Sequence, residues 1–385
     1  MSEEFLPFSR PSISRAAIEE VVACLESGWI TTGPRVKRFE QALGAYLGAP
    51  HVLALSSATA GLHLALAALD LQQGDEVITT PLTFAATLNT IVLAGATPVL
   101  VDVDPRTFNM DVSRLAGAIT ERTRAVIPVH FAGLPVDLDP LYALAQEHGL
   151  RVIEDAAHAI GTEYKGRRIG SFGDTQVFSF HPNKNMTTGE GGCVATRDAE
   201  LADKVALLRF HGMDREAWNR FGKAGSQHYE IVMPGYKYNM MDIQAALGLH
   251  QLPELDGFIR RRTELAQRYN GILKDWPEFT LPAVPEYPCH HAWHLYTPLV
   301  NPETAGMDRD QFMEAMKTRN IGTGLHYRVV HLYPYYREHF GFGTGDFPAA
   351  EHIGERIVSL PLFPGMTDSD QDRVLAAMAE IFAKS

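Results

Sequence analysis

The sequence predicts an α/β protein with a mostly parallel seven-stranded sheet and a smaller C-terminal α/β domain. Seven short apolar runs between about residues 51 and 196 alternate with stretches of helical length. Apolar strands that alternate with helices are typical of a parallel sheet covered on both faces. The length of 385 residues suits two or three domains. We therefore expect a large domain over residues 1–254 and a small domain over residues 255–385.

The elements follow from local patterns. The first helix is expected after Ser14, which can cap it, and before Gly28, which can end it. Its apolar stripe consists of Ile18, Val21, Val22 and Leu25. The seven predicted strands are HVLALS (51–56), EVITT (76–80), TPVLVDVD (97–104), AVIPVH (125–130), RVIEDA (151–156), TQVFSF (175–180) and GCVAT (192–196).

The later elements are less regular. Only twelve residues, 181–192, lead from the sixth run into the seventh, which is short for a helical crossover and predicts antiparallel pairing at one edge. Residues 213–234 show no clear period and predict a long loop. Beyond them we expect long helices over 240–273 with a proline interruption, a strand over 291–300 and a helix over 309–320.

Composition excludes several classes of protein. The 34 basic and 46 acidic residues give a net charge of −12, so no global basic field would attract nucleic acid. Three widely spaced cysteines form no metal-binding motif, so no metal is predicted, and they favour a reducing compartment. The chain starts without the features of a signal peptide, and no apolar stretch is long enough to span a membrane. We expect a cytoplasmic protein.

A candidate phosphate site lies in ALSSATAGLHLAL, residues 54–66. An apolar strand ends in small hydroxyl residues and runs directly into a helix. The N–H groups at that helix N-terminus, with the hydroxyls of Ser57 and Thr59, could cradle a phosphate. The alternative is an ordinary Ser/Thr helix cap. No Walker A motif is present.

A carboxylate follows the fifth predicted strand in RVIEDAAHAIG, residues 151–161. Ligands of open α/β sheets bind at the C-terminal edge, where Asp155 is expected. Asp155 could hold a protonated ring nitrogen, and His158 could orient its carboxylate. The alternative is an N-cap aspartate followed by a surface histidine.

Lys184 lies in SFHPNKNMTTGEGG, after the sixth predicted strand. A lysine amine in a partly dry site has a lowered pKa and becomes a nucleophile toward carbonyls. Ser179 could add a phosphate contact, and Phe84 could stack on a planar ring, with core packing as the alternative for Phe84. A phosphate cradle, a stacking ring, Asp155 and Lys184 on one sheet fit pyridoxal phosphate (PLP) better than any other cofactor. The dinucleotide motif GxGxxG is absent.

Longer motifs resemble the DegT/StrS-type sugar aminotransferases, which are PLP enzymes of fold type I. They are SSATAGLHLAL, TFAATLN, DVDPRTFNMD, VIEDAAHAIGTEYKGRRIGSFGD, FSFHPNKNMTTGEGG, GYKYNMMDIQAALGLHQL and IGTGLHYRVVH. The motifs FLPFSRP, LESGWITTGP, GYKYN, HAWHL and SLPLFP are most similar to the branch of UDP-4-amino-4-deoxy-L-arabinose–oxoglutarate aminotransferases. That branch carries Trp at the stacking position, where this chain has Phe84.

The resemblance implies a role for each site residue. Lys184 would bond the cofactor aldehyde, Asp155 would pair with the ring nitrogen, and His158 would lie beside the ring. The phosphate ligands would be Ala58, Thr59 and Ser179; the residues that reach a neighbouring subunit's site would be Lys237 and Asn239; and the substrate contacts would be Trp29, Thr31, His326 and Tyr327. Many relatives carry Asn where this chain has Lys237. A homodimer with shared active sites is implied.

The function expected from this resemblance is transamination from L-glutamate, with 2-oxoglutarate as the product, to a nucleotide-linked keto-sugar. A UDP-4-keto-pentose of cell-envelope or lipid A synthesis is the expected acceptor, and a nucleotide keto-hexose is the alternative. Related sugar dehydratases carry His at the position of Lys184, so the lysine favours transamination. A non-catalytic PLP regulator and a PLP lyase are the remaining alternatives.

Overall fold

A seven-stranded sheet forms the centre of the protein in the computed structural model, which describes residues 4–214 and 229–383. The strands are β1 (His51–Leu55), β2 (Glu76–Thr79), β3 (Thr97–Leu100), β4 (Thr123–Val126), β5 (Arg151–Asp155), β8 (Thr175–Ser179) and β9 (Gly192–Thr196). Their order across the sheet is β1-β9-β8-β5-β4-β2-β3. All seven predicted strands are therefore present in one sheet.

Strand direction follows the expected pattern with one refinement. Strands β2, β3, β4, β5 and β8 pair in parallel. Strand β9 is antiparallel to both of its neighbours, β8 and β1. The predicted antiparallel pairing at one edge is confirmed, but the reversed strand is second in the sheet. The short connection from β8 turns β9 back beside it, and β1 then takes the outermost position.

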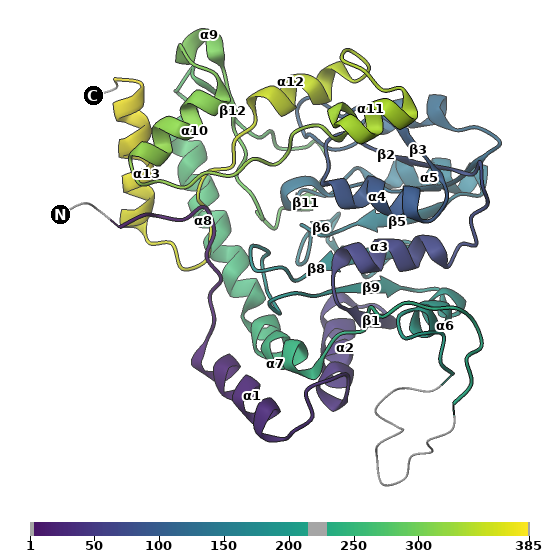
Figure 1. Cartoon of the computed structure of the whole chain (residues 1–385). Helices are drawn as coiled ribbons and strands as arrows, with labels where there is room; N and C mark the ends of the chain where they lie inside the picture. Colours follow the sequence, from purple (N-terminus) through teal and green to yellow (C-terminus); the bar gives the residue numbers. More distant parts are fainter. Residues whose placement is uncertain (1–3, 215–228, 384–385) are drawn as a thin grey trace.

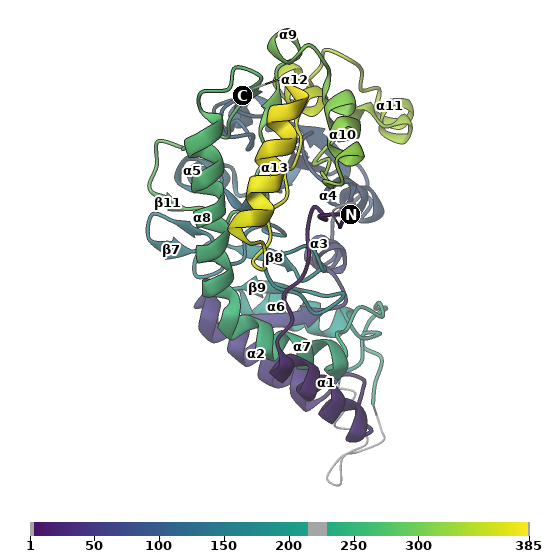
Figure 2. The same cartoon turned by 90° about the vertical axis from the view of Figure 1, so that its left-hand side faces the viewer.

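The helices surround this sheet and extend beyond it (Figures 1 and 2). The α-helices are α1 (Arg15–Glu26), α2 (Pro34–Leu47), α3 (Ala58–Ala67), α4 (Ala85–Leu93), α5 (Leu138–His148), α6 (Ala199–Leu208), α7 (Asp242–Gln251), α8 (Leu255–Leu273), α9 (Pro302–Ala305), α10 (Arg309–Thr318), α11 (Pro334–Phe340), α12 (Pro348–Arg356) and α13 (Asp368–Ile381). Short 3₁₀ helices are η1 (Val112–Ala118), η2 (Phe131–Gly133), η4 (Leu252–Glu254) and η5 (Val330–Leu332), and short strands are β6 (Glu163–Tyr164), β7 (Arg167–Arg168), β10 (Phe279–Thr280), β11 (Cys289–His290) and β12 (Leu299–Val300).

Both faces of the sheet are covered, as unbroken apolar strands require. Successive side chains of a strand point to opposite faces. Val77 and Ile153 belong to the buried cluster that contains the apolar residues of α3. Their neighbours Ile78 and Val152 belong to the cluster that contains those of α2 and α5. The sheet therefore separates two apolar layers, and only its strand ends are left for a site.

Helix α1 confirms the predicted cap, and most of its predicted apolar stripe is exposed. The Ser14 hydroxyl accepts a hydrogen bond from the N–H of Ala17. Helix α1 packs on α7 at the lower end of the molecule in Figure 1. Ile18, Val22 and Leu25 of the predicted stripe are 44%, 46% and 51% exposed. An apolar face on α1 is therefore uncovered in the single chain.

The C-terminal part of the chain has a core of its own. Helix α8 leads from α7 to a region in which α10, α13 and the short strand β12 pack together (Figure 1). Leu6 from the N-terminal segment joins this cluster, through a bridge with Ile321. The predicted helices over 240–273 and 309–320 are confirmed as α7 with α8 and as α10. The domain boundary at 254/255 stays a prediction, which the start of α8 at Leu255 supports.

The strand expected over 291–300 is wrong for most of its length. Only Leu299–Val300 forms a strand. Trp293 has a φ of +46°, a left-handed conformation that interrupts an extended chain. We refer to Ala292–Leu295 as the strap, because its backbone bonds connect several segments. The long loop expected over 213–234 lies mostly outside the described residues.

All three cysteines are free thiols, with Cys24 and Cys193 buried and Cys289 half-buried. Within the described ranges, no helix combines the length and apolar character needed to cross a membrane.

Close packing of α3 on the sheet gives a stability prediction. A Cβ atom at Gly61 would lie 2.6 Å from Cγ1 of Val177. Gly61→Ala should lower the free energy of unfolding by about 1–3 kcal/mol, because the helix must shift away from the sheet. Gly271 of α8 has no atom within 4 Å of such a Cβ, so Gly271→Ala serves as a control and should be neutral or slightly stabilising. Denaturant unfolding measures both, and equal effects would contradict this account.

Candidate active site

The strand ends β1, β2, β5 and β8 open onto one cavity of about 280 Å³. Ten of the fourteen predicted site residues line it: Ser57, Ala58, Thr59, Phe84, Asp155, His158, Ser179, Lys184, His326 and Tyr327. Parallel strands place their C-terminal ends at one edge, which explains why distant motifs meet here.

The phosphate cradle predicted at the start of α3 is built from a close approach of two backbones. The Ser57 hydroxyl caps the helix by accepting from the N–H of Ala60 at 3.0 Å, so the cap alternative is correct for this side chain. Ala58 and Thr59 are the first two helical residues, whose N–H groups have no intrahelical acceptor. A Cβ at Gly192 would lie 2.5 Å from the nitrogen of Ala58. Glycine there lets β9 support a helix N-terminus suited to a phosphate.

Asp155 is the last residue of β5 and is 6% exposed. One carboxylate oxygen accepts from the Thr87 hydroxyl at 2.8 Å and the other from the N–H of Ala157 at 3.2 Å. Burial raises the pKa of Asp155, while these hydrogen bonds and Lys184 act in the opposite direction. Asp155 is therefore not a helix cap, and Thr87, rather than His158, orients it. Sequence reasoning missed Thr87, although it lies in the motif TFAATLN that supplied Phe84.

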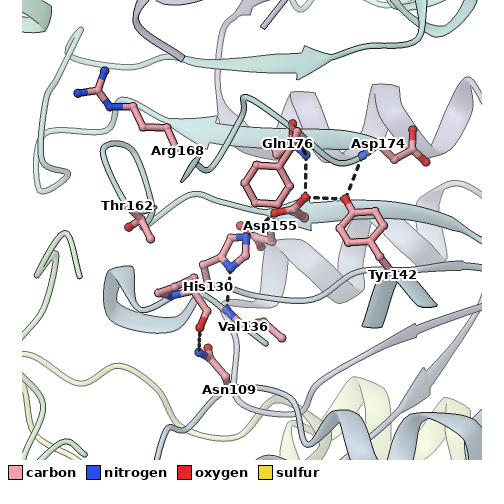
Figure 3. A network of polar contacts seen from close by, with 12 residues as sticks. Asn109, His130, Val136, Tyr142, Asp155, Thr162, Arg168, Asp174 and Gln176 are labelled. Atoms are coloured by element: carbon pink, nitrogen blue, oxygen red, sulfur yellow. Dashed lines mark hydrogen bonds and ion pairs between the residues drawn. The ribbon is translucent and has the colours of Figure 1, made fainter. Parts of the chain in front are cut away.

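Behind Asp155, on the other face of β5, the neighbouring Glu154 lies in a buried polar network. Its carboxylate accepts from Tyr142 Oη at 2.6 Å, Gln176 Nε2 at 2.7 Å and His130 Nε2 at 2.8 Å. Figure 3 shows Tyr142, Gln176 and His130 gathered around this part of the strand. Because all three donors are fixed in the core, they hold the end of β5 and with it the position of Asp155.

Lys184 lies in the loop after β8, with its backbone fixed on both sides. Its N–H donates to the carbonyl of His181, and the Nδ2 of the next residue, Asn185, donates to the carbonyl of Ala292 at 2.8 Å. Burial lowers the pKa of Lys184 to about 8, although the nearby Asp155 carboxylate acts to raise it. Its amine makes no ion pair within the described chain. Near pH 8 the amine can therefore act as a nucleophile and as a proton carrier.

Phe84 lies at the wall of the cavity and is 60% exposed. Its alternative role, ordinary core packing, is therefore wrong. The Phe84 ring lies 6.0 Å from that of Tyr327, with Lys184 and Asp155 on the same cavity. An exposed aromatic ring at this position suits stacking on a planar ligand, which stays a prediction.

His158 is buried, so the alternative of a surface histidine is wrong. Its Nδ1 accepts from the N–H of Ala132 at 3.2 Å, and its Nε2 lies 3.0 Å from the Tyr327 hydroxyl. Burial and the nearby Lys184 amine hold the pKa of His158 well below its usual value, so its ring is neutral. His326 also lines the cavity and pairs with the Ser359 hydroxyl at 2.8 Å.

Four predicted residues do not line this cavity: Trp29, Thr31, Lys237 and Asn239. Three of them, Trp29, Lys237 and Asn239, gather around Thr32 instead. Trp29 Nε1 donates to the carbonyl of Thr32 at 3.2 Å, and Asn239 bonds the hydroxyl of Thr32 and accepts from Lys237 Nζ at 2.7 Å. Asn239 lines a separate cavity of about 350 Å³. The single chain thus carries two groups of predicted residues at different places.

The cavity itself meets the needs of PLP. A helix N-terminus suits the phosphate, a buried carboxylate suits the ring nitrogen, and an amine with a lowered pKa suits the aldehyde. Gly192 supplies the backbone approach that the cradle requires. This combination on one sheet edge defines a PLP enzyme.

Comparison with known proteins supports the assignment of a PLP enzyme. The model of the DegT/DnrJ/EryC1/StrS aminotransferase family matches residues 11–379, and the chain belongs to this family. It is 50% identical over 378 residues, 98% of this chain and 97% of the relative, to the spore coat polysaccharide biosynthesis protein SpsC of Bacillus subtilis. Spr1654 of Streptococcus pneumoniae, described as a sugar aminotransferase and solved with PLP and in its PMP form, is 34% identical with a TM-score of 0.90, covering 98% of this chain and 99% of that chain.

A further solved structure is PseC of Helicobacter pylori, an aminotransferase of pseudoaminic acid biosynthesis. It is 31% identical, with a TM-score of 0.91 over 99% of this chain and all of that chain. The protein is therefore a PLP-dependent sugar aminotransferase of fold type I, which confirms the predicted fold, cofactor and enzyme class.

The lowered pKa of Lys184 gives a pH prediction. With a pKa of about 8, the neutral amine is the minority below pH 8 and the majority above it. The rate at which the cofactor-free protein captures PLP should rise with pH, with a midpoint near 8. Asp155→Asn removes the carboxylate that stabilises the charged amine, so its midpoint should be lower. Absorbance after rapid mixing measures both midpoints. Nα-acetyl-lysine, which keeps its side-chain amine, is the control. A midpoint near 10.5, the ordinary lysine value, would contradict the assigned environment.

Proposed function

We propose that the protein transfers an amino group from L-glutamate to the keto carbon of a nucleotide-linked sugar. The observation that carries this proposal is the placement of Lys184 and Asp155 in one cavity beside the α3 cradle. The α3 cradle would hold the phosphate, Asp155 the ring nitrogen and Lys184 the aldehyde of the cofactor. The family and its solved members support a sugar as amino acceptor.

When bound, PLP supplies an aldehyde that bonds amines and a ring that takes up the electron pair released from the substrate carbon. Lys184 Nζ would bond the cofactor aldehyde and, as a free amine, would accept a proton from one substrate carbon and return it to another. A pKa of about 8 suits this task, because the amine both accepts and returns a proton near neutral pH.

Asp155 would keep the ring nitrogen protonated. Its carboxylate accepts from Thr87 and Ala157 and keeps lone pairs for a further N–H donor. A charge-assisted bond to the ring favours the protonated nitrogen, because the buried carboxylate is otherwise poorly solvated. Phe84 would cover one face of the ring and exclude water from it.

The narrower acceptor expected from the sequence is a UDP-4-keto-pentose, and a nucleotide keto-hexose is the alternative. SpsC and PseC, by their names, belong to spore coat polysaccharide and pseudoaminic acid synthesis. They support a role in making a cell-surface sugar. Phe84 lies on the cavity wall, at the position where the pentose branch carries Trp. Because this residue differs from that branch, the acceptor has to be identified by experiment. The free thiols support the predicted cytoplasmic location.

We further propose that the enzyme is a homodimer with shared active sites. The uncovered apolar face of α1 suits burial against a second copy of the chain. Asn239 lines a different cavity from the one that Lys184 lines in the same chain. A two-fold dimer would let the residues around Thr32 complete the cavity of its partner, because each patch meets its counterpart.

Substitution of the lysine tests the reaction. Lys184→Ala should abolish the absorption band that arises from the bond between the lysine and PLP and lower turnover by at least about 10³-fold, because the nucleophile and the proton carrier are lost together. The wild-type protein loaded with pyridoxamine phosphate (PMP) should regain the PLP spectrum when it is mixed with the correct keto-sugar. A panel of UDP-, dTDP- and GDP-linked pentoses and hexoses identifies the acceptor.

Three outcomes would contradict the proposal. Retained multiple turnover by Lys184→Ala would remove the assigned role of the lysine. A dehydrated sugar formed without amino transfer would select the dehydratase alternative. No reaction of the loaded protein with any amino acid would select a non-catalytic role.

Mixed dimers test the shared site. Lys184→Ala and Asn239→Ala subunits, reassociated at random, should give about a quarter of wild-type activity, since half of the dimers are mixed and each has one intact site. Lys184→Ala mixed with Asp155→Asn is the control, because both changes affect the same cavity of one chain. Recovery only in the first mixture is expected. No recovery over either parent would show that the sites are not shared.

A further inference from the structure

Helix α2 begins without a cap from its own segment of the chain. Its N-cap residue is Gly33, which has no side chain to accept a hydrogen bond, and Pro34 follows as the first helical residue. A Cβ atom at Gly33 would clash with the indole of Trp29, so no side chain fits there. The next two N–H groups, those of Arg35 and Val36, have no acceptor within the helix. They need an acceptor from elsewhere in the chain.

Asp242, the first residue of α7, supplies both acceptors. One carboxylate oxygen accepts from the N–H of Val36 at 2.9 Å, and the other accepts from the N–H of Arg35 at 3.1 Å. These are the donors that an N-cap side chain normally serves. The guanidinium of Arg35 is paired with Glu20 of α1 at 2.8 Å, so Arg35 meets Asp242 through its backbone. Asp242 therefore caps α2 from a distant part of the sequence.

The start of α7 is capped in return by the loop that leads into α2. The N–H of Asp242 donates to the carbonyl of Thr31 at 3.1 Å, and that of Ile243 donates to the carbonyl of Ile30 at 3.5 Å. Each helix start thus satisfies the backbone of the other. We refer to residues 29–36 and 239–243 together as the double cap.

The double cap determines how the Asn239 side chain is oriented. The Thr32 hydroxyl donates its single proton to the carbonyl of Met240, so its oxygen is left to accept from Nδ2 of Asn239. The amide oxygen of Asn239 then faces the amine of Lys237, which donates to it at 2.7 Å. The position of Thr32 depends in turn on the start of α2, which Asp242 holds.

The charge of Asp242 suits this task. The residue is 0% exposed, and burial raises its pKa, while the N–H groups of Val36, Arg35 and Gly33 and the charge of Arg35 act in the opposite direction. Its carboxylate lies in the first turn of α7 and bonds the first turn of α2, and negative charge is favoured at a helix N-terminus. An asparagine would offer one acceptor oxygen and turn its NH₂ group toward the second N–H, so it could serve only one donor.

The predicted site residues that do not line the cavity of Lys184 lie in or beside the double cap; they are Trp29, Thr31, Lys237 and Asn239. We propose that Asp242 is the positioning residue that holds them in the geometry in which they complete the cavity of the partner subunit. This inference rests on the shared active sites proposed above. Loss of Asp242 should therefore damage the site of the other subunit and leave the cavity of its own chain intact.

Amide hydrogen exchange tests the cap without any reaction. Asp242→Ala removes both acceptors, so peptides that contain the N–H groups of Arg35 and Val36 should exchange about tenfold faster than in the wild type. Exchange over residues 181–188, which contain Lys184, should be unchanged. Near-ultraviolet circular dichroism checks that the variant is folded.

Two further variants set the scale of the effect. Asp242→Asn keeps one acceptor, so its exchange rates should lie between those of the wild type and of Asp242→Ala. Asp308→Ala is the matched control, since Asp308 caps α10 by accepting from the N–H of Gln311 at 2.8 Å. It removes a cap of the same kind elsewhere, so exchange at the double cap and the rate with L-glutamate should equal those of the wild type.

Mixed dimers show which cavity Asp242 serves. The readout is the absorbance change of the PLP-loaded protein with L-glutamate, which needs no sugar. The Asp242→Ala homodimer should react at least about tenfold more slowly than the wild type, because the partner's cavity is completed in the wrong geometry. Random reassociation with Lys184→Ala subunits should let about a quarter of the sites react at the wild-type rate, since half of the dimers are mixed and each has one intact site. Reassociation with Asn239→Ala subunits should give no such sites, because both changes then affect the double cap.

The proposal is overturned if Asp242→Ala exchanges or reacts like the wild type. It is also overturned if its mixture with Lys184→Ala gives no wild-type sites while Lys184→Ala mixed with Asn239→Ala does, because Asp242 would then act on the cavity of its own chain. If neither mixture gives wild-type sites, the shared site is contradicted and the role of Asp242 with it. Absence of any reaction of the wild type with L-glutamate would contradict the proposed function and would leave the exchange results unaffected.

Discussion

The site depends on one buried carboxylate at the end of a central strand. Asp155 has lost nearly all of its water, a state that is costly for a charged group without donors. Thr87 and the N–H of Ala157 supply two donors, and the amine of Lys184 supplies a nearby cation. The same charge moderates the effect of burial on Lys184, so the acid and the base of the site set each other's protonation.

Alternation along β5 gives two adjacent carboxylates different tasks. Glu154 points to the face that lies against α5 and is surrounded by three hydrogen-bond donors in the core. Asp155 points to the edge where the cavity lies. One carboxylate anchors the strand and the other serves the ligand, and the difference comes only from the twofold period of a strand.

Sequence reasoning predicted the sheet and the residues at its strand ends, because apolar runs mark strands and parallel strands share an edge. It could not predict the partner of His158, which depends on a left-handed turn at Ala132 and on a strap that bonds this turn from a distant part of the chain. It took HAWHL for part of a strand, since the pattern does not reveal the left-handed Trp293. The α1 stripe was visible, but an apolar pattern does not say what covers it.

Phe84 has a consequence for how such an enzyme can change. It is the N-cap residue of α4, yet its side chain makes no capping bond and is mostly outside the core. Replacement by a larger or smaller ring would therefore cost little folding energy and would leave the cradle, Asp155 and Lys184 intact. Evolution could alter the shape of the cavity at this wall without rebuilding the machinery, which makes divergence to new sugars accessible in single steps.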